Sequence, residues 1–183
     1  MKINTNTIGK FVVVVTSLSL IISLISIAYL SSVSVFAVPS EGQQKFSAQL
    51  SGDQEVPPLQ TNASGIAWFK SNRDNLEFEL NVTDLQGITM AHIHNGKQGE
   101  IGPPVLPLYK SDSPTILMNG KLASGNITAN MLEGPMEGKQ IANLTTAMKN
   151  NETYVNVHTH QNPNGEIRGQ IIISNSTTNS SNK

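Results

Sequence analysis

The chain has 183 residues, with 12 basic and 13 acidic side chains and no cysteine. The lack of cysteine excludes disulfides, a thiolate nucleophile, iron–sulfur clusters and zinc held by cysteine. The formal net charge of −1 gives no electrostatic reason to expect a nucleic-acid partner.

Residues 1–37 predict an export signal. Lys2 and Lys10 lie in an otherwise uncharged start, an apolar run covers residues 11–30, and small residues suited to a cleavage site follow. The apolar run, at about 20 residues, is also long enough to span a bilayer. A cleaved signal peptide and an uncleaved N-terminal membrane anchor therefore both stay open. In either case we expect the rest of the chain to be extracellular, secreted or held at the cell surface.

Cleavage after Ala37 would leave 146 residues, the size of one ordinary domain, with 10 basic and 13 acidic side chains. Residues 38–44 form a polar linker, residues 45–174 the predicted domain, and residues 175–183 a polar tail that we expect to be disordered. Asn-x-Ser/Thr sequons either carry glycans in an exported chain or arise by chance in one rich in these residues. They begin at Asn62, Asn81, Asn126, Asn143, Asn151, Asn175 and Asn179.

Period-two alternation dominates the domain and predicts antiparallel strands. In residues 75–82, Leu76, Phe78, Leu80 and Val82 share one face. Turn signals, including "MNG" at residues 118–120, separate the strand candidates, a pattern typical of a sandwich or barrel. The other candidates are residues 45–52, 65–70, 89–96, 154–160 and 165–173, with a weaker edge strand at residues 105–110 because Pro107 cannot donate to a ladder.

One segment follows helical rather than strand spacing. Ile141, Leu144 and Met148 recur at the period of an amphipathic helix. We therefore expect an all-β antiparallel fold with one short helix near residues 137–149, which covers an end or edge of the sheets.

All four histidines occur as two His-x-His pairs on predicted strands. Alternation turns Ala91 and Ile93 toward the core, and so turns His92 and His94 to the outer face. The same argument places His158 and His160 on the outer face of their strand, and Arg168 on the outer face of the next one. Ile167, Ile171 and Ile173 are expected to face inward there.

Residues i and i+2 on a strand are close enough for two imidazoles to reach one metal ion. If the two strands are neighbours, His92, His94, His158 and His160 form a candidate metal site. Neutral imidazoles suit copper, zinc or nickel, and copper is our first expectation, with zinc as the alternative. The competing interpretation is that these are ordinary surface histidines of a β protein.

Acidic residues give weaker indications. Asp53 and Glu55 in "SGDQEVPP" either pair as acid and base or only close a rigid turn. Glu166 is expected to form a salt bridge or to hydrogen-bond a metal-bound imidazole.

The segments "FSAQLSGDQEVPP", "AHIHNG" and "VHTHQNPNGEIRGQ" together resemble the CHRD (chordin-type) domain family over about residues 45–173. The resemblance implies an exported protein, and the biochemical role of the family is poorly defined.

A fainter resemblance is to copper/zinc superoxide dismutase, in the order of strand, Gly-containing turn and His-x-His, with a later strand histidine followed by an arginine. It implies a Greek-key β-sandwich or barrel of about eight strands, with His92, His94 and His158 as copper ligands and Arg168 as an anion-guiding residue. The zinc loop, the bridging histidine and both cysteines of those enzymes have no counterpart here. Without these features, the resemblance implies a mononuclear copper site.

Three functions follow as hypotheses. The first is a cell-surface or secreted binding module for a protein, matrix or small-anion partner, with a mononuclear copper or zinc site. The second is a copper-only, superoxide dismutase-like enzyme. The third is a structural envelope protein without metal.

Overall fold

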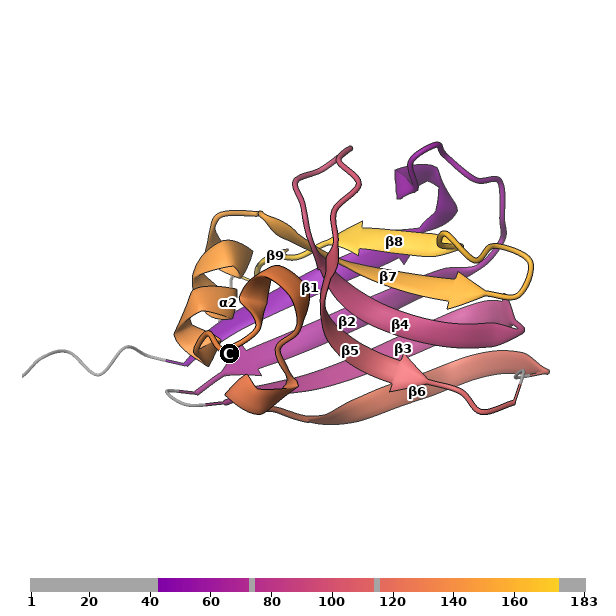
Figure 1. Cartoon of the computed structure of the whole chain (residues 1–183). Coiled ribbons are helices and arrows are strands. Elements are labelled where there is room, and N and C mark those ends of the chain that lie inside the picture. Colours follow the sequence, from indigo (N-terminus) through magenta and orange to yellow (C-terminus); the bar gives the residue numbers. More distant parts are fainter. Residues whose placement is uncertain (1–42, 73–74, 114–115, 175–183) are drawn as a thin grey trace, which may run out of the picture. The chain divides into compact units, whose positions relative to one another are not determined.

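The computed structural model describes residues 43–72, 75–113 and 116–174 (Figure 1). This part of the chain forms nine β-strands and one α-helix. The predicted signal or anchor of residues 1–37 and the predicted tail of residues 175–183 lie outside the described residues.

All strand pairs in the sheet are antiparallel. The strands are β1 (Gln44–Ser51), β2 (Ser64–Ser71), β3 (Leu76–Gln86), β4 (Ile88–Asn95), β5 (Pro104–Lys110), β6 (Leu117–Ile127), β7 (Thr153–Thr159), β8 (Ile167–Gln170) and β9 (Ile172–Ile173). Their order across the sheet is β5-β4-β7-β8-β1-β2-β3-β6, and β9 pairs with β1. The edge strands β5 and β6 contact each other, so the sheet curls into a nearly closed barrel. This confirms the predicted all-β antiparallel fold, and Pro107 lies on an edge strand as its missing N–H requires.

The core is formed by apolar side chains that alternate along the strands. Leu80 and Val82 on β3 and Ala91 and Ile93 on β4 are at most 1% exposed, as the period-two pattern predicted. The burial of such apolar side chains is the main favourable contribution to folding. Because successive side chains point to opposite faces, the burial of Ala91 and Ile93 turns the two histidines of β4 the other way.

The predicted turn at residues 118–120 was wrong, because these residues lie inside β6. Gly120 has φ +116°, a conformation that favours glycine, and the pairing between β3 and β6 shifts register beside it. A β-bulge therefore accommodates residues that are typical of turns without ending the strand.

The last predicted strand is interrupted. Ile167 and Ile171 are fully buried as predicted, but Ile173 is 40% exposed and does not face the core. Ile171 separates β8, which pairs with β7 and β1, from β9, which among the described strands pairs with β1 alone. This interruption ends the alternation on which the prediction for Ile173 depended.

Helix α2 (Ile141–Lys149) covers one end of the sheet next to β9 (Figure 1). Ile141, Leu144 and Met148 are buried, which confirms the predicted inward stripe. The helix begins at Ile141 because Gln140 and Asn143 form a capping box there. In the described part of the chain, no helix is long and apolar enough to cross a membrane.

The core predicts a large difference between a buried and an exposed leucine. Leu80→Ala removes a fully buried side chain and should lower the free energy of unfolding by about 2–5 kcal/mol. The matched control Leu117→Ala, at a side chain that is 60% exposed, should change it by less than about 0.5 kcal/mol. Urea denaturation of both variants checks this, and equal losses would contradict the assignment of Leu80 to the core.

Candidate metal centre

The pairing of β4 with β7 brings the two His-x-His pairs together. In this ladder Met90 lies opposite His158, and His92 lies opposite Asn156. His92 and His158 are therefore diagonal neighbours on one face of the sheet. Side chains of this length reach each other across such a diagonal.

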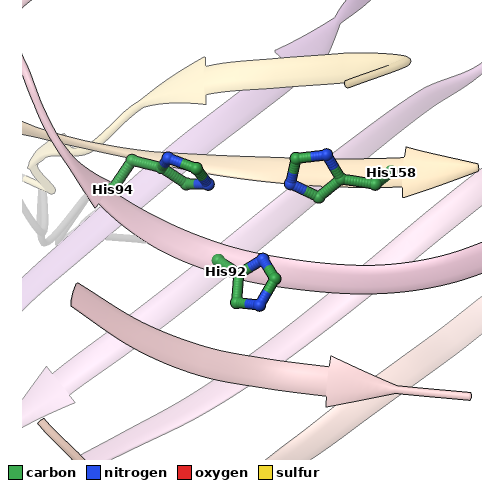
Figure 2. Close-up of side chains that lie close together, drawn as sticks. All are labelled: His92, His94 and His158. Atoms are coloured by element: carbon green, nitrogen blue, oxygen red, sulfur yellow. The ribbon is translucent and has the colours of Figure 1, made fainter. Parts of the chain in front are cut away.

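His92, His94 and His158 converge on one point. One nitrogen from each ring lies within 4.8 Å of the corresponding nitrogens of the other two. Figure 2 shows the rings of His94 and His158 directed toward each other, with His92 completing a triangle. Zinc binds imidazole nitrogen at about 2.0–2.1 Å, so small side-chain rotations would let all three nitrogens share one ion.

Backbone carbonyls fix the orientation of two of these rings. His94 Nδ1 lies 2.8 Å from the Gly102 oxygen, and His158 Nδ1 lies 3.0 Å from the Pro163 oxygen. A carbonyl only accepts, so Nδ1 carries the proton in both rings and Nε2 keeps a free lone pair. His94 Nε2, His158 Nε2 and His92 Nδ1 are buried without a hydrogen-bond partner. Metal-binding histidines show this arrangement, with one nitrogen held by a carbonyl and the other free.

Burial lowers the pKa of all three imidazoles below the usual 6.5. For His92 the charge of His158 adds to burial. For His94 burial is again the largest cause. The hydrogen bond to Gly102 opposes it, and the charges of His92 and Arg168 lower the pKa further. The three rings are therefore neutral near pH 7, the state in which imidazole binds a metal.

The loop between β4 and β5 holds His94 through Gly102. The Gly102 carbonyl accepts from His94, and the Gly102 N–H donates to Tyr154 Oη at 3.1 Å. A Cβ on Gly102 would lie 1.6 Å from the Asn95 carbonyl oxygen, so only glycine fits here. The Tyr154 ring also stacks on His94, with centroids 5.0 Å apart.

Glu166 orders the loop between β7 and β8. Its carboxylate accepts hydrogen bonds from Thr159 Oγ1 at 2.7 Å and from Thr61 Oγ1 at 3.1 Å. These bonds hold the turn that presents the Pro163 carbonyl to His158. In the described residues Glu166 makes neither of the two contacts predicted for it, a salt bridge or a hydrogen bond to an imidazole.

The CHRD domain family matches residues 46–171, a range that contains all three converging histidines. The chain belongs to the CHRD domain family. Chordin from Xenopus laevis is 30% identical in an alignment of 142 positions that covers 73% of this chain and 13% of chordin. The chain thus spans a small part of that relative. No solved structure gives a significant match.

His160 lies outside the candidate centre of this CHRD domain. Strand β7 ends at Thr159, and the His160 N–H donates to the Gly87 oxygen at 2.9 Å. Its side chain is exposed. The turn that starts here ends the alternation that would have kept His160 on the face of His158. The structure therefore brings together three of the four predicted ligands.

Arg168 lies on the same face of the CHRD domain but is buried, at 3% exposed. Its Nη2 donates to the Lys97 oxygen at 3.0 Å, and its Cζ lies 3.5 Å from the centroid of the Tyr154 ring. The outer-face position predicted for Arg168 is correct. The β4–β5 loop, which supplies the Lys97 carbonyl, covers Arg168 on that face.

The sequence does not predict the burial of Glu55. It is 8% exposed, and burial raises its pKa to about 7 against the opposing charge of Arg168. Its Oε1 has no hydrogen-bond partner, and a Cβ on Gly165 would lie within 2.6 Å of both this atom and the Asn156 side chain. Asp53 is exposed, so the two acids do not form a buried pair. The only signal in the sequence is one acidic residue before two prolines, and it does not indicate burial.

The shifted pKa values act on stability in opposite directions. The pKa values of the three histidines are lowered, so as the pH falls these residues take up protons in the unfolded chain first. The histidines therefore lower the free energy of unfolding as the pH falls below 6.5. Glu55 has a raised value, so it removes stability as the pH rises from 4.5 to about 7.

The metal-free protein should show these histidine shifts directly. The ring protons of His92, His94 and His158 should titrate below pH 6.5 in the native state, because protonation puts charge into a buried cluster. NMR titration measures this, with the urea-unfolded chain as the reference near 6.5. Native values at or above the unfolded ones would contradict the burial argument.

Proposed function

We propose that this CHRD domain is an exported binding module that holds one transition-metal ion, copper or zinc, on His92, His94 and His158. Two observations carry the proposal: one nitrogen from each of the three imidazoles lies within 4.8 Å of those of the other two, and each ring has a buried nitrogen without a hydrogen-bond partner. Leaving a buried acceptor unpaired costs about 1–3 kcal/mol, a cost that a shared ion would remove.

The donor set supports copper or zinc among the common metals. Imidazole nitrogen suits both ions, whereas magnesium and calcium prefer oxygen ligands. Three protein ligands also leave a coordination position for water or another small ligand. The carbonyl of Gly102 and that of Pro163 hold His94 and His158 in the tautomer that a metal requires.

Export is supported by the N-terminal signal or anchor pattern and by the resemblance to chordin. Several sequon asparagines are exposed, so the folded domain would leave them open to glycans; they are Asn62, Asn126, Asn143 and Asn151. We propose that the domain acts at the cell surface or outside the cell and binds a protein or matrix partner there.

The copper-only, dismutase-like alternative uses the same three ligands and needs an anion-guiding cation. The guanidinium of Arg168 is 3% exposed and donates to a backbone carbonyl, so it offers little to an anion arriving from solvent. The alternative of a metal-free structural protein does not account for the three unpaired nitrogens.

Metal binding should depend on the three converging histidines and not on His160. One copper or zinc ion per chain should bind at pH 8. His92→Ala or His158→Ala should lower the affinity at least about a hundredfold through loss of a ligand. The matched control His160→Ala, at an exposed histidine outside the cluster, should bind like the wild type. Calorimetric titration measures this, and unchanged uptake by both cluster variants would rule out the shared site.

The bound ion should leave as the pH falls. Protons compete with the metal for the imidazole nitrogens, so occupancy should decline between about pH 8 and 5. Metal content after dialysis at stepped pH measures this. Retention of the ion by wild type at pH 5 with no loss would indicate ligands other than histidine.

The enzyme alternative has a separate test. Because Arg168 is buried, copper-loaded protein should remove superoxide no faster than an equal concentration of free copper. A stopped-flow superoxide assay measures this. Superoxide turnover well above that of free copper would support the dismutase-like hypothesis.

A further inference from the structure

Arg168 brings a positive charge without a close counter-charge to the face that carries the three histidines. Its side chain is buried, and in the described residues no carboxylate lies within 4.0 Å of it, the two ion pairs being Lys70–Glu77 and Lys121–Glu79. Its guanidinium donates to the carbonyl of Lys97 and lies over the ring of Tyr154, which are both uncharged. A buried charge of this kind acts at longer range than one in water.

Glu55 is the carboxyl group that acts on this charge. Arg168 stabilises its ionised form, but burial opposes ionisation more strongly and raises the pKa of Glu55 to about 7. At neutral pH Glu55 is therefore an anion for only part of the time. Arg168 keeps a net positive effect on its surroundings.

The imidazole cluster is close enough to be affected. Tyr154 contacts both partners: its ring stacks on His94 at 5.0 Å and lies 3.5 Å from the guanidinium carbon. The positive charge of Arg168 therefore repels a cation held at the His94 ring.

The three ligands cannot offset the charge of an ion, because each is a neutral imidazole. In the described residues no carboxylate belongs to the cluster of His92, His94 and His158. The full charge of a bound ion therefore faces Arg168, and a divalent ion meets twice the repulsion of a monovalent one.

We propose that Arg168, partly offset by Glu55, makes this centre select copper(I), a monovalent ion, over divalent ions such as zinc(II). The inference rests on the proposed metal-binding function and names the ion that the site prefers. One unit of charge across a stacked ring, at an effective dielectric constant near 20, corresponds to a selectivity on the order of tenfold.

The test compares the affinities of the whole protein for the two metal ions at pH 7, where Glu55 is ionised for only part of the time and offsets Arg168 only in part. Copper(I) affinity is measured by competition with bicinchoninate under anaerobic, reducing conditions. Zinc(II) affinity is measured by competition with a chromophoric zinc chelator. The readout is the preference ratio, defined as the zinc(II) dissociation constant divided by the copper(I) dissociation constant.

Arg168→Gln removes the charge but keeps an amide that can donate to the Lys97 carbonyl. It should lower the preference ratio on the order of tenfold, because zinc(II) gains more than copper(I). The matched control Arg168→Lys keeps the charge and should leave the ratio within about threefold of wild type.

Glu55→Gln should move the ratio in the opposite direction. Loss of the counter-charge leaves Arg168 unopposed, so zinc(II) affinity should fall more than copper(I) affinity. Purely structural damage would lower the affinities for both ions by a similar factor in both variants. If Arg168→Gln does not fold, the direction of the Glu55→Gln change decides the question.

Two results would overturn the inference. Neutral variants that change both affinities by the same factor would show that Arg168 does not set the selectivity. A ratio that rises in Arg168→Gln would show the reverse of the proposed effect. If the wild type binds neither ion, the metal-binding function itself fails, and this inference falls with it.

Discussion

The register between β4 and β7 is the constraint on which the candidate centre depends. It sets Met90 opposite His158 and so places His158 diagonal to His92. A slip of one residue would turn every side chain of one strand to the other face. Ala91, Ile93, Val155 and Val157 prevent such a slip, because all four are fully buried and would otherwise become exposed. The packing of the core thus holds the histidines together.

Two loops orient the imidazole rings that the strands bring together. The β4–β5 loop presents the Gly102 carbonyl to His94, and the β7–β8 loop presents the Pro163 carbonyl to His158. Each carbonyl accepts a hydrogen bond from Nδ1–H and leaves Nε2 free. Loops bury these rings as well, and burial keeps them neutral. The site is therefore preorganised for a ligand that accepts lone pairs.

The charges around the centre are separated from the ligands. Arg168 is held by a carbonyl and an aromatic ring, and its charge acts on Glu55, whose ionisation burial disfavours. The buried guanidinium can act on an ion through its field without touching it. This division between neutral ligands and a nearby charge distinguishes the centre from one that binds metal through carboxylates.

The sequence alone determined the strand alternation, the short helix and the face that carries His92, His94, His158 and Arg168. These follow from local periodicity, which the burial of Ala91, Ile93 and Leu144 confirms. Tertiary structure decided the rest. His160 lies outside the centre because the chain turns after Thr159. Glu55 and Arg168 are buried because loops distant in sequence fold over them. Alternation predicts the direction of a side chain from its neighbours in the chain. Strand ends and loop cover depend on contacts between distant segments, which no local pattern records.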